Sequence, residues 1–243
     1  KEMLPLIVIP TTAGTGSECQ SFALISDSKT HQKMACGDSK AAAKIAILDP
    51  GLTLSQPENV TVCTGIDAIA HAVETAVTNK RNKLSTLFSE ESFKLLLPNF
   101  TKVLNQPNDI SARGSMLLGA AMAGCAIEAS MLGAAHSLAN PLTAHYNIVH
   151  GQAVGMMLPY VVRFNSEIEE CRGVYVNLMK VAQIECENES ADKVNNLAAY
   201  LLNLLLQTGL PIRLREVIAD KSELKVLAKE ASAQWTAGFN PRL

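Results

Sequence analysis

The sequence lacks the patterns that identify nucleic-acid-binding or membrane-spanning proteins. Its formal net charge is -2, and no run of lysine and arginine exceeds two residues. Neither nucleic acid nor an acidic membrane surface is therefore an expected partner. The stretch from Met116 to Ile127 is uncharged and mostly apolar, but it is shorter than the ~20 residues that a membrane-spanning helix needs. The start of the chain shows no secretory signal pattern, and a small-molecule substrate is the expected partner.

Paired cysteines are also lacking. The six cysteines are widely spaced and form no C-x-x-C pair, which argues against a thiolate zinc site. Most lie in apolar stretches, so we expect buried free thiols and a location in the cytoplasm. The six are Cys19, Cys36, Cys63, Cys125, Cys171 and Cys186.

The chain has two parts that differ in their predicted secondary structure, and we predict a domain boundary near residue 56. Residues 1–56 are β-rich, with short apolar runs ended by turn residues. Residues 57–243 are helical. The chain opens on a strand-like segment without an initiating Met, which indicates a fragment of a longer protein. The predicted strands are 6–9, 22–25 and 45–48, with 6–9 expected to be buried. The predicted helices are 58–78 with a break at Gly65, 90–97 ending at Pro98, 111–132, 191–208 and 221–233.

A candidate metal site rests on Asp67, His71, His136 and His150. The chain has only five histidines, and three of them belong to this set. Asp67 and His71 are four residues apart and project from the same face of a helix. One carboxylate and three imidazoles suit a divalent transition metal such as iron(II) or zinc. The alternative is a set of core histidines satisfied by ordinary hydrogen bonds, because a D-x-x-x-H pair alone is a weak signal.

A second candidate site is the segment Pro10-Thr11-Thr12-Ala13-Gly14-Thr15-Gly16-Ser17-Glu18, which directly follows a predicted strand. Its glycines let the backbone approach a ligand, and its hydroxyls add hydrogen-bond donors. This chemistry suits a phosphate, a ribose or a nicotinamide amide. The segment is neither a Walker loop nor a G-x-G-x-x-G fingerprint. The alternative is a tight turn between two strands.

Taken together, these segments closely resemble the iron-containing (group III) alcohol dehydrogenase family. The similar stretches run in family order along nearly the whole chain. They are 10–18, Asp49-Pro50, 65–74, 133–151, 158–165 and Asn240-Pro241-Arg242.

The resemblance implies a fold, an activity and a set of roles. The fold would be an α/β remnant, the C-terminal part of a nucleotide-binding domain, followed by an all-α metal-binding domain, as in dehydroquinate synthase-like architectures. The activity would be NAD- or NADP-dependent interconversion of an alcohol and an aldehyde or ketone, by a homo-oligomer such as a dimer. The implied metal ligands are Asp67, His71, His136 and His150. The implied cofactor residues are Thr11, Thr12, Gly14, Thr15, Gly16, Ser17 and Lys33; the alternative for Lys33 is a solvated strand lysine.

Two departures from the family pattern matter. The Gly-rich pyrophosphate loop of the family does not precede Thr11, so we expect this chain alone to bind a dinucleotide weakly. Asn140 stands where many members carry a second histidine, four residues after the one that His136 matches. Asn140 is the candidate catalytic residue, but its amide cannot titrate. The alternatives are a specialised reductase of a carboxylated or phosphonated aldehyde, and a non-catalytic metal-binding remnant. His145 is expected to be a helix-surface residue.

Overall fold

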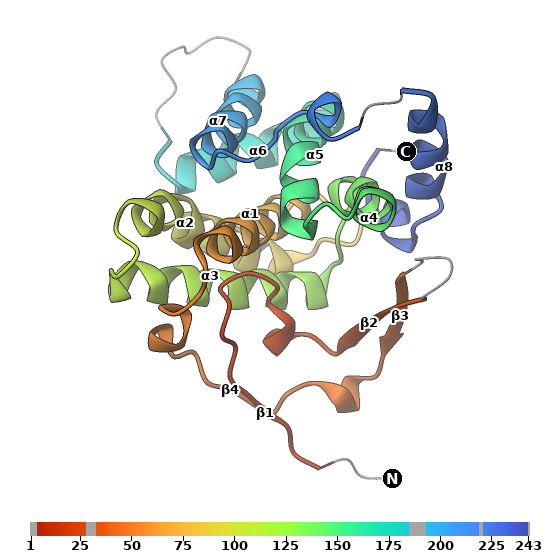
Figure 1. Ribbon diagram of the computed structural model, residues 1–243. Helices are drawn as coiled ribbons and strands as arrows, with labels where there is room; N and C mark the ends of the chain where they lie inside the picture. Colours follow the sequence, from red (N-terminus) through yellow and green to blue (C-terminus); the bar gives the residue numbers. More distant parts are fainter. Residues whose placement is uncertain (1–3, 28–32, 185–192, 219–220, 243) are drawn as a thin grey trace.

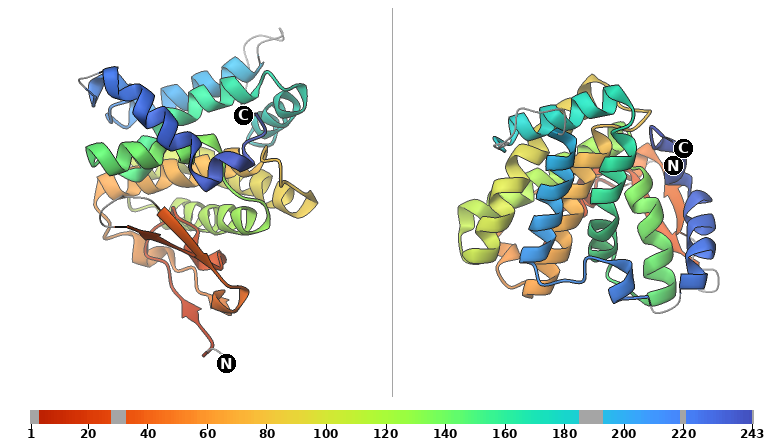
Figure 2. Two further views of the ribbon diagram at one scale, coloured as in Figure 1. Left: turned by 90° about the vertical axis from the view of Figure 1, so that its right-hand side faces the viewer. Right: turned by 90° about the horizontal axis from the view of Figure 1, so that it is seen from above.

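The computed structural model describes residues 4–27, 33–184, 193–218 and 221–242. Figures 1 and 2 show the α-helices stacked in layers above a small region of strands, with the N-terminus at the far end of that region. The strands are β1 Ile7–Val8, β2 Phe22–Ser26, β3 Lys33–Gly37 and β4 Ile45–Ala46. The helices are α1 Glu58–Thr75, α2 Lys83–Asn105, α3 Ile110–Ala129, α4 Ala134–Tyr146, α5 His150–Asn165, α6 Glu169–Val181, α7 Lys193–Gln207 and α8 Leu224–Ser232. Short 3-10 turns include η1 Ser17–Cys19, η3 Pro50–Thr53, η5 Lys221–Glu223 and η6 Trp235–Phe239.

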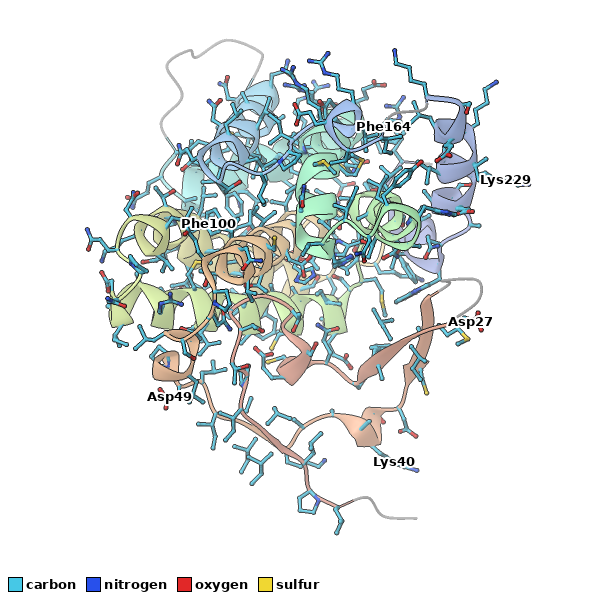
Figure 3. The ribbon with its side chains drawn as sticks, viewed as in Figure 1. Asp27, Lys40, Asp49, Phe100, Phe164 and Lys229 are labelled. Atoms are coloured by element: carbon cyan, nitrogen blue, oxygen red, sulfur yellow. The ribbon has the colours of Figure 1, made fainter. Side chains whose placement is uncertain are left out.

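The strands form two separate pairs. β1 pairs with β4 in parallel, and β2 pairs with β3 in antiparallel register, with Leu24 opposite Ala35. The prediction that residues 6–9 form a buried strand was wrong in its burial, because Ile7 is 56% exposed. Among the described residues β1 pairs with β4 alone, and it lies away from the helices; Figure 3 shows side chains here spreading into open space. β3 was not predicted.

The predicted break of the first helix at Gly65 was wrong. α1 continues from Glu58 to Thr75 without interruption. Gly65 serves packing instead, because a Cβ on it would lie 2.6 Å from the ring of Phe100 on α2. Phe100 is fully buried (Figure 3). The glycine thus lets the two helices approach closely. Asp67 and His71 lie on the same unbroken helix as the residues before Gly65.

The predicted helix end at Pro98 was also wrong, because α2 runs through it to Asn105. A proline inside a helix removes one backbone hydrogen bond and disturbs the preceding turn. Here the side-chain amide of Asn99 donates to the carbonyl of Leu95 over 2.8 Å and supplies a partner in that turn. Burial of Leu96, Leu97 and Phe100 in the core offsets the lost bond.

The remaining predictions have mixed outcomes. α3 ends at Ala129, before the predicted Leu132, and is long and apolar enough to span a membrane by length and composition, though 61% of that window is buried. Residues 221–233 form η5 and α8 in place of one helix. Residues 191–192 and Cys186 lie outside the described residues.

Of the other five cysteines, all free thiols, Cys63 and Cys171 are buried and Cys36 is exposed, so the expectation of mostly buried thiols was too broad. The boundary at residue 56 stays a prediction.

Candidate metal centre

Three helices bring the four candidate ligands together. Asp67 and His71 lie on α1, one turn apart. His136 lies in the first turn of α4, and His150 is the first residue of α5. The predicted set therefore converges, although the two halves of it are separated by more than sixty residues in the sequence.

Glycines allow these helices to meet at the site. A Cβ on Gly151 would lie 1.9 Å from the carbonyl oxygen of Cys63, so only a glycine lets the start of α5 rest on α1. A Cβ on Gly133 would lie 3.1 Å from Glu74 Oε1, which shows how closely the N-terminus of α4 approaches the same helix. These two close approaches help to set where His136 and His150 stand relative to Asp67.

The ring nitrogens of all three histidines surround one carboxylate. His136 Nε2 lies 3.3 Å from Asp67 Oδ1, and His150 Nε2 lies 3.9 Å from the same oxygen. His71 Nε2 lies 3.6 Å from Asp67 Oδ2. The His71 and His136 rings are stacked, with centroids 4.8 Å apart. Each imidazole thus presents the same type of nitrogen to a common point.

The four candidate ligands differ in burial. Asp67, His71 and His136 are buried, whereas the side chain of His150 is 30% exposed. A second buried carboxylate, Glu74 of α1, contacts Nδ1 of His136 and accepts a hydrogen bond from the backbone N–H of Ala135 over 2.6 Å. Among the four candidate ligands, His150 is therefore the one that reaches solvent.

The electrostatics of the site reflect these contacts. Burial opposes the charged form of Asp67, but the neighbouring His71 and His136 outweigh it and hold the pKa of Asp67 below its usual range. Burial lowers the pKa of His71. Burial would do the same to His136, yet Glu74 and Asp67 outweigh it and raise the pKa of His136 to about 9. Two carboxylates around His136 therefore favour a positive charge at this point.

The donor set fits a divalent metal. His136 gives its Nδ1–H to Glu74, so in the neutral ring Nε2 carries a lone pair and faces another acceptor, Asp67 Oδ1. Neither atom has a hydrogen-bond partner among the described residues, although both are buried. Such pairing is unfavourable unless a cation or a second ring proton lies between the atoms. Ligand atoms around a tetrahedral metal with bonds of about 2.1 Å are about 3.4 Å apart. The separations of 3.3 and 3.6 Å lie near that value, and the ligand atoms of Asp67, His71 and His136 all lie within 4.8 Å of one another. His150 Nε2 stands farther off, 3.9 Å from Asp67 Oδ1.

The Thr/Gly segment lies against this centre. The backbone of Gly14 is close enough to His71 to raise its pKa in opposition to burial. A Cβ on Gly14 would lie 2.4 Å from Cβ of Thr64 on α1, so the segment rests directly on the helix that carries two ligands. Thr11, Thr15 and Ser17 are exposed. These residues are therefore accessible to a ligand, and Ser17 Oγ donates to Thr15 Oγ1 over 3.1 Å.

The structure also shows the environment of three further residues considered in the sequence, Asn140, Lys33 and His145. Asn140 follows His136 by one turn on α4, and its Nδ2 donates to Oε1 of Gln234 over 3.2 Å. Lys33 begins β3, but its side chain lies outside what the structure describes. His145 is exposed and pairs with Glu230 over 2.7 Å, as expected of a surface residue.

Glu74 was missed by the sequence analysis. It lies three residues after His71, on the same helical face, so a signal was present. A helical glutamate is usually a solvated surface residue, and only the approach of α4 to α1 shows its contact with His136.

Comparisons with known proteins identify the family of the chain. Residues 61–243 match the model of the Fe-containing alcohol dehydrogenase family, C-terminal, and residues 1–50 match that of iron-containing alcohol dehydrogenase. The NAD-dependent methanol dehydrogenase of Bacillus methanolicus is 31% identical over 100% of this chain and 64% of its own length. Lactaldehyde reductase of Escherichia coli is 29% identical over 100% of this chain and 63% of its own length. The chain thus spans less than two thirds of either relative.

Solved structures show the same fold. An alcohol dehydrogenase from Oenococcus oeni superposes with a TM-score of 0.92 at 26% identity, covering 100% of this chain and 63% of that one. An iron-containing alcohol dehydrogenase from Thermotoga maritima gives 0.81 at 30% identity, covering 100% and 61%. They confirm the predicted fold class, a strand-containing part of a cofactor domain followed by a helical domain. Because the C-terminal family model matches more than half of its residues, the chain belongs to the iron-containing alcohol dehydrogenase family.

Proposed function

We propose that the full-length protein is a metal-dependent, NAD- or NADP-dependent oxidoreductase that interconverts an alcohol and an aldehyde or ketone. One observation carries the proposal: three imidazole nitrogens surround a buried carboxylate at separations of 3.3, 3.6 and 3.9 Å. The family membership of the chain supports the same activity.

The residues that would hold the metal are Asp67, His71, His136 and His150. A bound divalent metal supplies Lewis acidity at a substrate oxygen, and a nicotinamide supplies or accepts hydride at the neighbouring carbon. Burial keeps bulk solvent away from Asp67, His71 and His136. The partly exposed His150 marks the side from which a small alcohol would enter. The protein's part is to keep the reacting groups adjacent.

The Thr11 to Ser17 segment would orient the nicotinamide half of the dinucleotide. Its support is position: the backbone of Gly14 lies beside His71, and the hydroxyls of Thr15 and Ser17 are exposed. A dinucleotide held there would present its nicotinamide to the metal centre. Lys33 would contact the ribose, as the family resemblance implies.

Several finer points belong to the same proposal. Family membership favours iron, whereas intrinsic ligand affinity favours zinc. One relative is named as NAD-dependent, which favours NAD over NADP. We further propose that the protein acts in the cytoplasm as a homo-oligomer, with small-molecule partners only.

A substrate panel tests the proposed activity. Full-length protein reconstituted anaerobically with iron(II) or zinc should oxidise primary alcohols or reduce aldehydes, measured by the absorbance of reduced nicotinamide with NAD and with NADP. Activity should depend on added metal and disappear with a chelator. A folded, metal-loaded and dinucleotide-bound protein that turns over no alcohol or aldehyde would contradict the proposal and favour a non-catalytic metal-binding role.

Asn140→His should change how the activity of the full-length enzyme depends on pH. The wild-type amide cannot titrate, whereas an unperturbed imidazole has a pKa of about 6.5. If residue 140 faces the substrate, neutral imidazole would act as a base in alcohol oxidation. The rate should then rise about tenfold per pH unit below that pKa and level off above it. We also expect the substrate preference to shift from functionalised aldehydes toward simple alcohols.

Gln234→Ala is the matched control, because it removes the hydrogen-bond partner of Asn140 without adding a titratable group. It should leave the shape of the pH–rate profile unchanged. An unchanged profile and an unchanged substrate ranking in folded, metal-loaded Asn140→His would show that Asn140 only ties α4 to Gln234.

A further inference from the structure

A buried carboxylate next to the candidate ligands has no part in the function proposed above. Glu74 is 3% exposed and lies on α1, on the helical face that carries Asp67 and His71. A buried glutamate is rare unless its charge is compensated. Both of its oxygens are engaged at the start of α4: Oε2 contacts Nδ1 of His136, and Oε1 accepts the backbone N–H of Ala135 over 2.6 Å.

The two contacts have different chemical consequences. The contact with Ala135 satisfies one of the free N–H groups at the N-terminus of α4, where negative charge is favourable. The contact with His136 selects the tautomer of a candidate ligand. A carboxylate only accepts hydrogen bonds, so Nδ1 must be the donor, and in the neutral ring Nε2 keeps its lone pair. That nitrogen faces Asp67 Oδ1 at 3.3 Å.

We propose that Glu74 is a positioning residue of the metal centre, which holds His136 as the Nδ1–H tautomer with Nε2 directed at the metal. The proposal rests on the metal site proposed above. α1 then supplies two ligands directly and orients a third through Glu74. Gly133 is part of the same arrangement, because a Cβ there would lie 3.1 Å from Glu74 Oε1. Carboxylates that accept from a ligand histidine raise its basicity and strengthen metal binding.

Glu74→Gln tests the proposal with little change of shape. An amide offers one acceptor oxygen, whereas Ala135 N–H and His136 Nδ1–H both need one. If the amide turns its NH₂ toward His136, Nδ1 must accept that hydrogen bond. The proton of the neutral ring then lies on Nε2, which loses its lone pair on the metal side. We expect the dissociation constant for zinc or cobalt(II), measured by competition with a chromophoric chelator, to rise by about 10- to 100-fold.

Ser137→Ala is the matched control. Ser137 is buried in the same turn of α4 and hydrogen-bonds with Gly133 O and with Thr236 Oγ1, at 3.0 and 2.7 Å, away from the imidazole of His136. Its loss should lower the melting temperature with little change in metal affinity. Equal weakening of metal binding in both variants would mean that any loosening of α4 suffices, and would overturn a specific role for Glu74.

A spectroscopic measurement on the wild-type chain keeps the proposal testable even if Glu74→Gln does not fold. In the zinc-loaded protein, the imidazole nitrogen NMR signals of His136 should show a proton on Nδ1 and none on Nε2. The reverse assignment would overturn the proposal, as would undiminished affinity in folded Glu74→Gln. Both outcomes leave the metal site intact, whereas a wild-type chain that binds no metal at all overturns the metal site and the role of Glu74 together.

Discussion

Replacing His136 and His150 together by alanine should reduce the metal content of the purified protein from about one atom per chain to nearly none. The double variant keeps only Asp67 and His71 from the set, and two ligands are fewer than the three or four that protein sites for such metals provide. The two removed nitrogens lie 3.3 and 3.9 Å from Asp67 Oδ1. Elemental analysis after dialysis measures the effect directly.

His145→Ala is the control for the loss of a histidine. His145 lies on α4 like His136, but its side chain is 43% exposed and pairs with Glu230. Its replacement should leave the metal content unchanged. The double variant also leaves Glu74 buried without its histidine partner, so circular dichroism must show that it is folded. Full metal retention in the folded double variant would refute the predicted ligand set.

The metal set could be predicted because its signal depends on residue type and on one short spacing. Asp67 and His71 are four residues apart, and the scarcity of histidine makes His136 and His150 conspicuous. The distance of 3.3 Å between His136 and Asp67 could not be derived, because it depends on how α4 packs against α1. Glu74 was missed for the same reason.

The errors in helix boundaries also have a tertiary cause. Gly65 and Pro98 are local signals for the end of a helix, and each predicted one. In the structure Gly65 makes room for the ring of Phe100, and Pro98 is carried within a helix whose apolar side chains are buried. Packing energy outweighs a weak local preference here. α4 likewise continues through Pro141 to Tyr146.

The strand-containing part was predictable only in outline. The apolar runs at 22–25 and 45–48 correspond to β2 and β4, although β4 is shorter. β3 was missed because Lys33 to Gly37 includes lysine, alanine and glycine, which are depleted in strands. In the structure β3 pairs with β2, and the hydrogen bonds of this pair hold it as a strand. Strand formation in this region therefore depends on the neighbouring strand more than on the local sequence.

Replacing Gly16 by valine should displace the Thr/Gly segment from the helical body. Gly16 has a φ of 62°, in the left-handed region, which is especially unfavourable for a β-branched residue. A Cβ there would also lie 2.7 Å from the carbonyl oxygen of Ala120 and from Cα of Gly124, both on α3. Backbone strain of about 1–2 kcal/mol and overpacking of about 1–3 kcal/mol add to a destabilisation of about 2–5 kcal/mol.

The same variant should weaken the use of the dinucleotide. Gly14, two residues earlier, lies beside His71, so a displaced segment would no longer hold a nicotinamide near the metal centre. We expect the KM for the dinucleotide in the full-length enzyme to rise at least about tenfold, the equivalent of about 1.4 kcal/mol of lost binding. Thermal melting measures the first effect, and initial rates at varied dinucleotide concentration measure the second. Gly173→Val is the control, because Gly173 lies on α6 with no atom within 4 Å of its added Cβ. An unchanged melting temperature and KM in Gly16→Val would mean that the segment does not depend on its contact with α3.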